Sequence, residues 1–250
     1  MGTYSPDQRT AVVSGAAGGL GFAVTELLLE RGTQVSMVDV DAQRLADATG
    51  RLQGEPQALL ADLSRTAECD RVIAEAEGHW GRIDILVNCA AIVHRIDLFE
   101  LDEATFSRII NTNLRSVFWL CRGVIPGMEA RSWGRIVNLT SVGVHTGGYR
   151  LTSAVYEATK AGVGSLTKTL ARAFASKGIL VNAVAPGAMR TRMMLDETPA
   201  DVLEEVSRDI PLGRLGEPME VAEVIAFLAG ERNTYVTGAT FDANGGLIMA

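Results

Sequence analysis

Short apolar runs alternate with helix-patterned segments along nearly the whole chain. The β-branched run "RTAVVS", residues 9–14, precedes "GFAVTELLLERG", residues 21–32, in which apolar residues recur at helical spacing. The pattern continues, with further strands expected in "QVSMVDV", "PQALLAD", "IDILVNCA", "GRIVNLTS", "ILVNAVAP" and "YVTGATFDANGG". Continuously apolar strands that alternate with helices predict an α/β domain, with a mostly parallel seven-stranded sheet covered by helices on both faces.

The chain has the length of one large domain of this kind. Its 250 residues are 47% hydrophobic and 21% charged, which supports a sizeable core. Residues 1–250 contain no internal repeat or linker, so a single domain is expected. One long irregular segment is expected at about residues 189–217, and such a loop in a compact domain is usually functional, often a lid. Its methionines form either an apolar lid wall or ordinary packing: Met189, Met193 and Met194.

Charge and composition exclude several classes of partner. The formal net charge is −7 and no run of basic residues occurs, so we expect no nucleic-acid partner and no anionic membrane surface. No apolar run approaches the ~20 residues that cross a bilayer, and the polar start "MGTYSPDQRT" lacks a secretory signal. Cys69, Cys89 and Cys121 are scattered without a CxxC pair, which predicts reduced thiols in a cytoplasmic protein and no metal site.

A glycine-rich turn, "SGAAGGLG", joins the first expected strand to the first helix. Glycines let the backbone turn sharply and approach a pyrophosphate closely, and the helix N-terminus then offers free N–H groups to the phosphates. Any tight strand-to-helix turn can use glycine, but the position after the first strand favours a dinucleotide site. The candidate contacts in this turn are Gly15, Gly18, Gly19, Leu20 and Gly21.

Asp39 follows the second strand about 20 residues later, where a dinucleotide site places a carboxylate against the adenosine ribose. The alternative role is a helix cap, but Asp41 is better placed for that. A 2′-phosphate beside Asp39 would meet a like charge, at a cost of roughly 1–4 kcal/mol. No Arg or Lys lies in the glycine turn or directly after Asp39, so NAD(H) is predicted in preference to NADP(H).

The pentapeptide "YEATK" places Tyr156 and Lys160 one helical turn apart, at the start of a helix-patterned segment. A free tyrosine has a pKa near ~10 and is rarely ionised at neutral pH. A cation one turn away, together with a positive nicotinamide, favours the phenolate and is expected to lower the pKa of Tyr156. The pair then suits general acid–base catalysis of proton transfer to or from an alcohol oxygen.

The motifs of the whole chain, in order, resemble those of the short-chain dehydrogenase/reductase family. TGxxxGxG appears as "SGAAGGLG", NNAG as "NCAA", PGxxxT as "PGAMRT" and YxxxK as "YEATK". The asparagine of the long helix appears as Asn113 and the serine after the fifth strand as Ser141. The C-terminal run "PLGRLGEPMEVAEVIAFLAG" is similar to the 3-oxoacyl-[acyl-carrier-protein] reductase-like branch. The resemblance implies a doubly wound Rossmann-type fold and, commonly, a homotetramer in contact through the long helix of Asn113 and the C-terminal strand.

The resemblance also implies roles for individual residues. Tyr156 is the expected general acid and base, and Lys160 also binds the nicotinamide ribose. Ser141 is expected to hold the substrate oxygen, and Asn113 to support a water chain that feeds protons to Lys160. Further cofactor contacts are implied at the adenine, the adenosine ribose and the nicotinamide carboxamide: Asp62, Leu63, Asn88, Ala90, Pro186, Gly187, Met189 and Thr191.

Some positions depart from the family pattern. Ser14 replaces a threonine, and Cys89 and Ala91 replace residues of NNAG. The interval from Ser141 to Tyr156 is longer than usual by about two residues, which a loop absorbs at little cost. Ser153, within this interval, is expected to cap the Tyr156 helix. Two histidines that follow the fourth and fifth strands lie either in the substrate pocket or in solvated loops: His94 and His145.

The sequence therefore predicts an NAD(H)-dependent oxidoreductase that interconverts a secondary alcohol and a ketone. One alternative is an NADPH-dependent 3-oxoacyl-[acyl-carrier-protein] reductase, because Arg131 and Arg172 lie where such enzymes carry basic residues near the carrier protein. Another is a non-catalytic nucleotide sensor, which would be expected to lack the tyrosine or lysine. The expected partner is a small alcohol or ketone, and neither its identity nor the physiological direction follows from the sequence.

Overall fold

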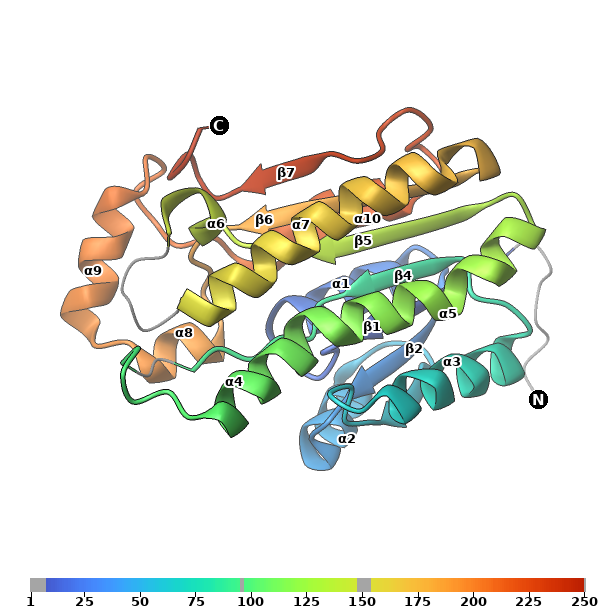
Figure 1. Ribbon diagram of the computed structural model, residues 1–250, viewed down its shortest axis with the longest axis horizontal. Coiled ribbons are helices and arrows are strands. Elements are labelled where there is room, and N and C mark those ends of the chain that lie inside the picture. The colour runs from blue at the N-terminus through green and yellow to red at the C-terminus, as the bar shows by residue number, and fades with distance from the viewer. Residues whose placement is uncertain (1–7, 95–96, 148–153, 250) are drawn as a thin grey trace.

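The computed structural model describes residues 8–94, 97–147 and 154–249 (Figure 1). Its sheet is entirely parallel, with strand order β3-β2-β1-β4-β5-β6-β7, which confirms the predicted doubly wound Rossmann-type fold. All seven predicted strands are present: β1 Thr10–Ser14, β2 Gln34–Asp39, β3 Gln57–Leu60, β4 Ile85–Asn88, β5 Gly134–Leu139, β6 Ile179–Pro186 and β7 Thr240–Ala243.

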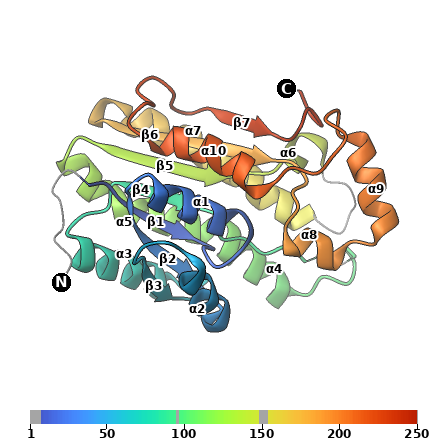
Figure 2. The same cartoon turned by 180° about the vertical axis from the view of Figure 1, so that it is seen from behind.

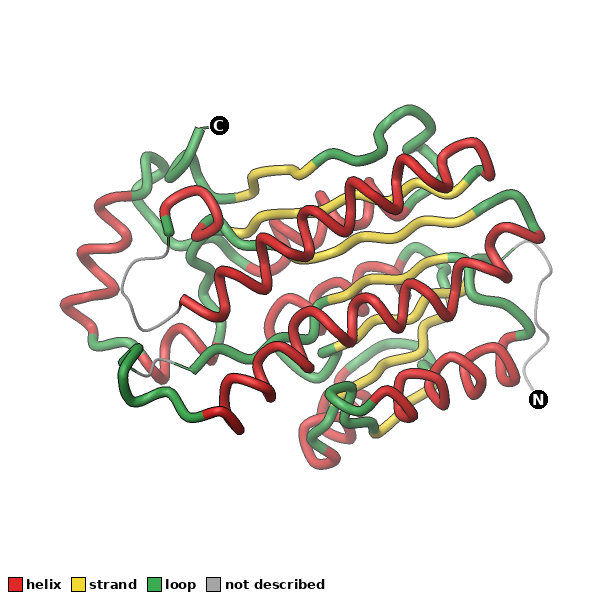
Figure 3. Tube along the Cα trace, in the orientation of Figure 1, coloured by secondary structure: helices red, strands yellow, loops and turns green. Residues whose placement is uncertain are grey.

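Helices cover both faces of this sheet, as the tube in Figure 3 also makes clear. One face carries α3 Thr66–Trp80, α5 Ser116–Ala130 and α7 Ala154–Phe174, which lie in front in Figure 1. The other carries α1 Gly19–Glu30, α2 Ala42–Arg51 and α10 Pro218–Ala229, which Figure 2 brings forward. Each face has its own buried apolar cluster, and β strands contribute to both. In the described residues, no helix combines the length and hydropathy needed to span a membrane.

Local sequence explains where several helices begin. Asp41 accepts a hydrogen bond from the backbone N–H of Arg44 and caps α2, as predicted. At α10, Glu217 and Glu220 form a reciprocal capping box around Pro218 at the first helical position. The predicted cap of α7, Ser153, lies outside the described residues.

The long helix expected at about residues 104–128 is divided. It consists of α4 Glu103–Ile110, the π-helical turn η1 Asn111–Arg115 and α5. A π turn inserts an extra residue into the helical ladder and often marks a functional site. Here it contains Asn113, a predicted site residue.

The segment at residues 189–217 was predicted to be irregular, and that prediction was wrong for its middle. Two helices occupy it, α8 Arg192–Glu197 and α9 Ala200–Asp209. The sequence "ADVLEEVSRD" has its apolar residues at helical spacing, but its mean hydropathy is low because charged residues outnumber apolar ones, so the segment resembles a loop in composition. The described residues also form two short helices, α6 Gly143–Thr146 and η3 Ala175–Lys177.

Candidate active site

The sheet topology places a crevice at the carboxyl ends of β1 and β4. After β1 the chain continues outward to β2 and β3, and then returns to the other side of β1 as β4. Ligands of open parallel sheets bind at such a switch point. Asp39 and Asn88 end β2 and β4, and the glycine turn and Ser141 follow β1 and β5, all at this edge of the sheet.

Three glycines of the turn are required by the fold itself. Gly15 has a φ of 65°, and a Cβ there would lie 2.8 Å from Cα of Ala90. A Cβ on Gly21 would lie 2.1 Å from the carbonyl oxygen of Gly15. Gly19 has a φ of 51° and begins α1. Leu20 is buried in the core, so its side chain contributes to packing, and only its backbone can serve a ligand.

Gly18 differs from these glycines. Its backbone is extended, with φ −160°, and a Cβ built on it would meet no described atom within 4 Å. The fold therefore does not require glycine at this position, although it caps the N-terminus of α1. Free N–H groups beside an open glycine face fit a bound pyrophosphate. The turn is thus suited to hold a dinucleotide.

Asp39 lies beside this turn. Its Oδ2 accepts a hydrogen bond from the N–H of Ala17 at 3.0 Å, and its Oδ1 accepts one from Val40 at 2.8 Å. The carboxylate is thus fixed between the glycine turn and the end of β2. The nearby Arg44 pairs with Asp41, at 3.5 Å, rather than with Asp39. The carboxylate therefore lies beside the glycine turn, where the sequence predicts the ribose of a dinucleotide.

The end of β4 is joined to the glycine turn by a hydroxyl. Ser14 Oγ accepts a hydrogen bond from the N–H of Ala90 at 3.1 Å, so the serine that stands in place of the threonine connects the end of β1 to the segment after β4. Asn88 turns inward and donates to Oδ1 of Asn138 at 2.8 Å, which leaves only its backbone to face a cofactor. Asn138 in turn donates to Oγ1 of Thr167 in α7, at 2.9 Å.

Sequence reasoning missed this Asn88–Asn138–Thr167 chain. It joins β4, β5 and α7 through buried side chains, and no local motif indicates it. Asp62 is exposed in the turn after β3 and accepts a hydrogen bond from the N–H of Ser64 at 3.0 Å, while the adjacent Leu63 is buried.

Asn113 is fully buried in the π turn. Its amide donates to the carbonyl of Ile92 at 2.8 Å and accepts from the N–H of Ile92 at 2.9 Å. These two bonds fix the segment after β4 against the long helix. One amide hydrogen and one lone pair of the side chain are engaged there, so any water that Asn113 serves must be bound through its backbone, its second amide hydrogen or its remaining lone pair.

Tyr156 and Lys160 lie on one side of α7, with Nζ of Lys160 5.6 Å from the centre of the tyrosine ring. Lys160 is 2% exposed, and its Nζ donates to the carbonyl of Leu139 at the end of β5, at 2.8 Å. Ser141 follows two residues later and accepts a hydrogen bond from the N–H of Gly143 at 3.0 Å. The structure therefore brings α7 to the end of β5, as the predicted chemistry requires.

The electrostatics of this pair differ from the prediction. Burial raises the pKa of the Tyr156 phenol, and the neighbouring Glu157 raises it further, so the predicted lowering is wrong for the protein alone. Burial also lowers the pKa of Lys160 to about 8. The phenol is therefore held in its protonated form, and any phenolate must be favoured by groups beyond this chain, such as a cationic nicotinamide.

The segment after β6 approaches the glycine turn. Pro186 ends β6, and a Cβ on Gly187 would lie 2.8 Å from Cα of Asn244, so the backbones touch there. Met189 pairs with Gly216 in an isolated bridge. A Cβ on Gly19 would lie 3.4 Å from Cγ2 of Thr191. The expected carboxamide contacts therefore lie beside the expected pyrophosphate contacts.

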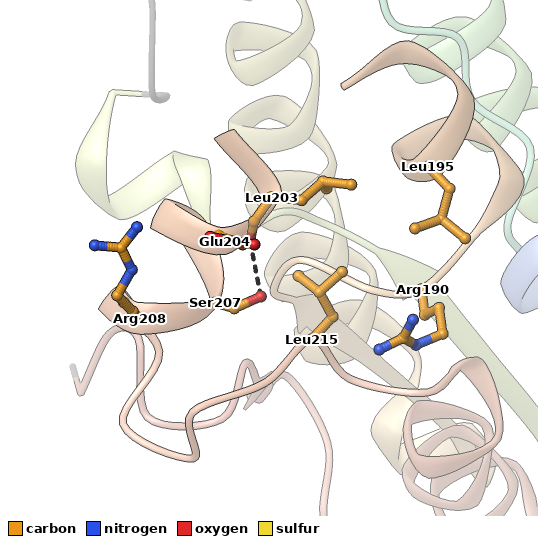
Figure 4. Close-up of a pocket in the computed structure, with 7 residues that line it drawn as sticks. All are labelled: Arg190, Leu195, Leu203, Glu204, Ser207, Arg208 and Leu215. Carbon is orange, nitrogen blue, oxygen red and sulfur yellow. Dashed lines mark hydrogen bonds between the residues drawn. The ribbon is translucent and has the colours of Figure 1, made fainter. Parts of the chain in front are cut away.

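A cavity of about 390 Å³ lies between α8, α9 and the strand-like turn at Leu215 (Figure 4). Its walls combine leucines with two arginines: Arg190, Leu195, Leu203, Glu204, Ser207, Arg208 and Leu215. Arg190 pairs with Glu217 at 3.0 Å. None of the predicted catalytic residues lines this cavity, which therefore belongs to the 189–217 segment.

Two other predictions concern a pair of histidines and a pair of arginines. His145 in α6 has its Nε2 3.7 Å from Oδ1 of Asp242 in β7, whereas His94 is half-buried in the segment after β4. Arg131 donates to the carbonyl of Ile83 at 2.6 Å and lies 3.6 Å from buried Asp84, so its guanidinium serves the fold. Arg172 is exposed on α7.

Comparison with known proteins gives matches over nearly the full chain. Residues 15–248 match the sequence model of a family described as enoyl-(acyl carrier protein) reductase. The 3-oxoacyl-[acyl-carrier-protein] reductase FabG of Vibrio cholerae is 40% identical, over 96% of this chain and 98% of the relative. The acetoacetyl-CoA reductase of Allochromatium vinosum is 37% identical, over 96% and 99%. A Sinorhizobium fredii relative, 35% identical over 96% and 98%, is described as an uncharacterized short-chain type dehydrogenase/reductase.

These matches agree with the observed fold. The chain belongs to the short-chain dehydrogenase/reductase family, whose members use a nicotinamide cofactor, and is an oxidoreductase that acts on CH–OH or keto groups.

Proposed function

We propose that this protein is an NAD(H)-dependent oxidoreductase that interconverts a secondary alcohol and a ketone, with Tyr156 as general acid and base. The observation that carries the proposal is the placement of Tyr156 and Lys160 on one side of α7 at the end of β5, close to Ser141. The nicotinamide, when bound, supplies or accepts the hydride.

The residues of the chain then handle the proton and the oxygen. The protonated phenol of Tyr156 donates its proton to the oxygen of a ketone as that oxygen gains charge, and takes it back in the reverse direction. Ser141 offers a hydroxyl to the same oxygen. Lys160, with its pKa lowered to about 8, changes charge easily near neutral pH and can pass a proton towards the phenol. Proton transfer of this kind contributes typically about 10²–10⁴-fold.

The substitution Tyr156→Phe tests the role of the phenol. We expect turnover of acetoacetyl-CoA with NADH to fall about 10²–10⁴-fold, because the ring remains but its proton is lost. NADH binding, followed by the fluorescence of the nicotinamide, should stay at the wild-type level. Retained turnover would mean that another group handles the proton. Loss of binding as well would support a structural role for Tyr156.

The preference for NAD(H) rests on Asp39. Its carboxylate is fixed beside the glycine turn by Ala17 and Val40, where a 2′-phosphate would meet a like charge. We expect the kcat/KM of wild-type protein with NADH to exceed that with NADPH. A strong preference for NADPH would overturn this part of the proposal.

The second candidate is an NADPH-dependent 3-oxoacyl-[acyl-carrier-protein] reductase, favoured by the 40% identity to a relative of that name. Asp39 opposes its cofactor, and the engagement of Arg131 with Asp84 and Ile83 removes one of the two basic residues expected to face a carrier protein. Turnover of acetoacetyl-CoA compared with the same acyl group on a carrier protein separates the two candidates.

We also propose assembly as a homotetramer. Strand β7 is at the edge of the sheet, and Phe106 and Phe118, on the long helix, are each 46% exposed. These are the two surfaces through which the family resemblance implies contact. Light scattering coupled to size-exclusion chromatography measures the assembly directly, and a monomer at micromolar concentration would contradict the proposal.

A further inference from the structure

Glu157 is a carboxyl group in the active site to which the proposed chemistry gives no role. It follows Tyr156 in α7, and its side chain is hydrogen-bonded to the hydroxyl of Ser141. The carboxyl also lies tightly against α6, because a Cβ on Gly143 would be 2.2 Å from Oε1 of Glu157. Glu157 thus contacts the residue expected to hold the substrate oxygen.

The second carboxyl oxygen is left without a partner. Oε2 of Glu157 is buried, and no described residue forms a hydrogen bond with it. An ionised carboxylate needs several donors when it is removed from water, whereas a neutral carboxyl needs fewer. Burial accordingly raises the pKa of Glu157 above its ordinary value, while Ser141 and Lys160 oppose this. The protonated form of Glu157 therefore persists to a higher pH than that of a glutamate in water.

The hydroxyl of Ser141 has one proton to donate and two lone pairs to accept with. The N–H of Gly143 occupies one lone pair, at 3.0 Å. If Glu157 is protonated, its O–H donates to the second lone pair, and the serine proton is directed to the substrate. If Glu157 is ionised it can only accept, so it takes the serine proton and the substrate oxygen loses that donor.

We infer that Glu157 is a positioning residue whose protonated form directs the Ser141 hydroxyl to the substrate oxygen and whose ionised form withdraws it. This inference rests on the proposed function, because it assumes that Ser141 holds the reacting oxygen. It makes ketone reduction depend on a proton that is never transferred to the product.

Of the charged groups near Glu157, those on α6 and η1 have other partners. Lys160, one turn further along α7, lowers the pKa of the Glu157 carboxyl by its charge. Tyr156 directly precedes Glu157 in the chain. His145 of α6 faces Asp242 of β7 instead, at 3.7 Å. Arg115 of η1 donates to the carbonyl of Ser64.

The test compares pH profiles of kcat/KM for the reduction of acetoacetyl-CoA by NADH. In wild-type protein, kcat/KM is expected to fall by up to about 10²-fold as Glu157 ionises, because one donor to the developing oxyanion is lost. In Glu157→Gln the amide N–H₂ donates to Ser141 at every pH. The ratio of variant to wild type should therefore rise with pH through the Glu157 transition.

The matched control is Glu103→Gln, an exposed glutamate on α4, which packs against α7. Its profile should parallel that of the wild type. Gly143→Ala provides a second route, because the added methyl displaces the Glu157 carboxyl from Ser141 and should also flatten the pH dependence. Gly143→Ala serves as the test if Glu157→Gln does not fold.

Parallel profiles of wild type and Glu157→Gln, or activity lost at every pH, would overturn the inference about Glu157. The Tyr156→Phe variant, measured alongside, separates this outcome from failure of the proposed function. If Tyr156→Phe is inactive but the Glu157→Gln profile is unchanged, only the positioning role fails. If Tyr156→Phe retains turnover, the proposed function fails.

Discussion

The two halves of the active site are built in different ways. In the nucleotide half, around the glycine turn, backbone meets backbone, as in the approach of Gly15 to Ala90 and of Gly21 to Gly15. In the substrate half, around α6 and the start of α7, side chains determine the geometry, as in the contacts of Glu157 with Ser141 and Gly143. The first half tolerates almost no added atom, whereas the second can change with each side chain.

Among the substitutions that test this comparison, Gly21→Ala should have the largest effect on stability. A methyl group 2.1 Å from the carbonyl oxygen of Gly15 forces the backbone of the turn apart. We expect a loss of more than about 3 kcal/mol in the free energy of unfolding, at the upper end of overpacking effects. Denaturant unfolding followed by circular dichroism measures this loss.

Gly18→Ala is the matched control in the same turn. Its methyl group meets no described atom within 4 Å, and its backbone is extended, so the free energy of unfolding should stay at the wild-type value. Affinity for NADH should nevertheless fall, because the methyl occupies the face offered to the pyrophosphate. A Gly18→Ala variant that unfolds easily would show that the turn is constrained by the fold throughout.

This contrast also explains what the sequence could and could not predict. The strands, their parallel direction and the glycine turn could be predicted from local patterns, because apolar periodicity and glycine spacing reflect the backbone directly. The raised pKa of Tyr156 did not follow, because it depends on burial by residues distant in sequence. Helix α8 was missed because it has only six residues, and α9 because its sequence is mostly polar although its apolar residues have helical spacing. Glu157 is part of the motif "YEATK", but its contact with Ser141 depends on the fold.

Replacement of Asp39 tests the nucleotide half at its charged end. Asp39→Asn keeps the shape and removes the like charge, so discrimination against NADPH should fall by as much as about 4 kcal/mol in the ratio of kcat/KM values. The control is Asp41→Asn, which removes a charge two residues away and retains a good helix cap. If both variants change the ratio equally, the effect comes from overall charge, not from contact with the ribose site.

Lys160 lies where the two halves of the active site meet, and its burial can be tested by the pH dependence of stability. Its pKa is lowered from 10.5 to about 8 by burial, so between these values the unfolded chain binds more protons than the folded one. Lys160 should therefore contribute a rise of about 3 kcal/mol to the free energy of unfolding across this window. The three cysteines oppose it, because burial raises the pKa of each thiol. Lys160→Met should lack this rise when the two proteins are unfolded by denaturant at a series of pH values. An unchanged rise in the variant would assign the effect to other groups.

The smallest expected effect lies where the two halves meet the 189–217 segment. Thr191 caps α8 by accepting a hydrogen bond from the N–H of Met194 at 3.4 Å. Thr191→Val keeps the shape but removes the acceptor, which should destabilise this short helix by about 1 kcal/mol. Amide hydrogen exchange should become faster in residues 192–197, while global unfolding stays unchanged. Thr191→Ser retains the hydroxyl and should exchange like the wild type. If Thr191→Val leaves the exchange rates of residues 192–197 unchanged, then α8 is held by its packing against the rest of the segment. The hydrogen bond of its N-terminal cap then adds nothing to its stability.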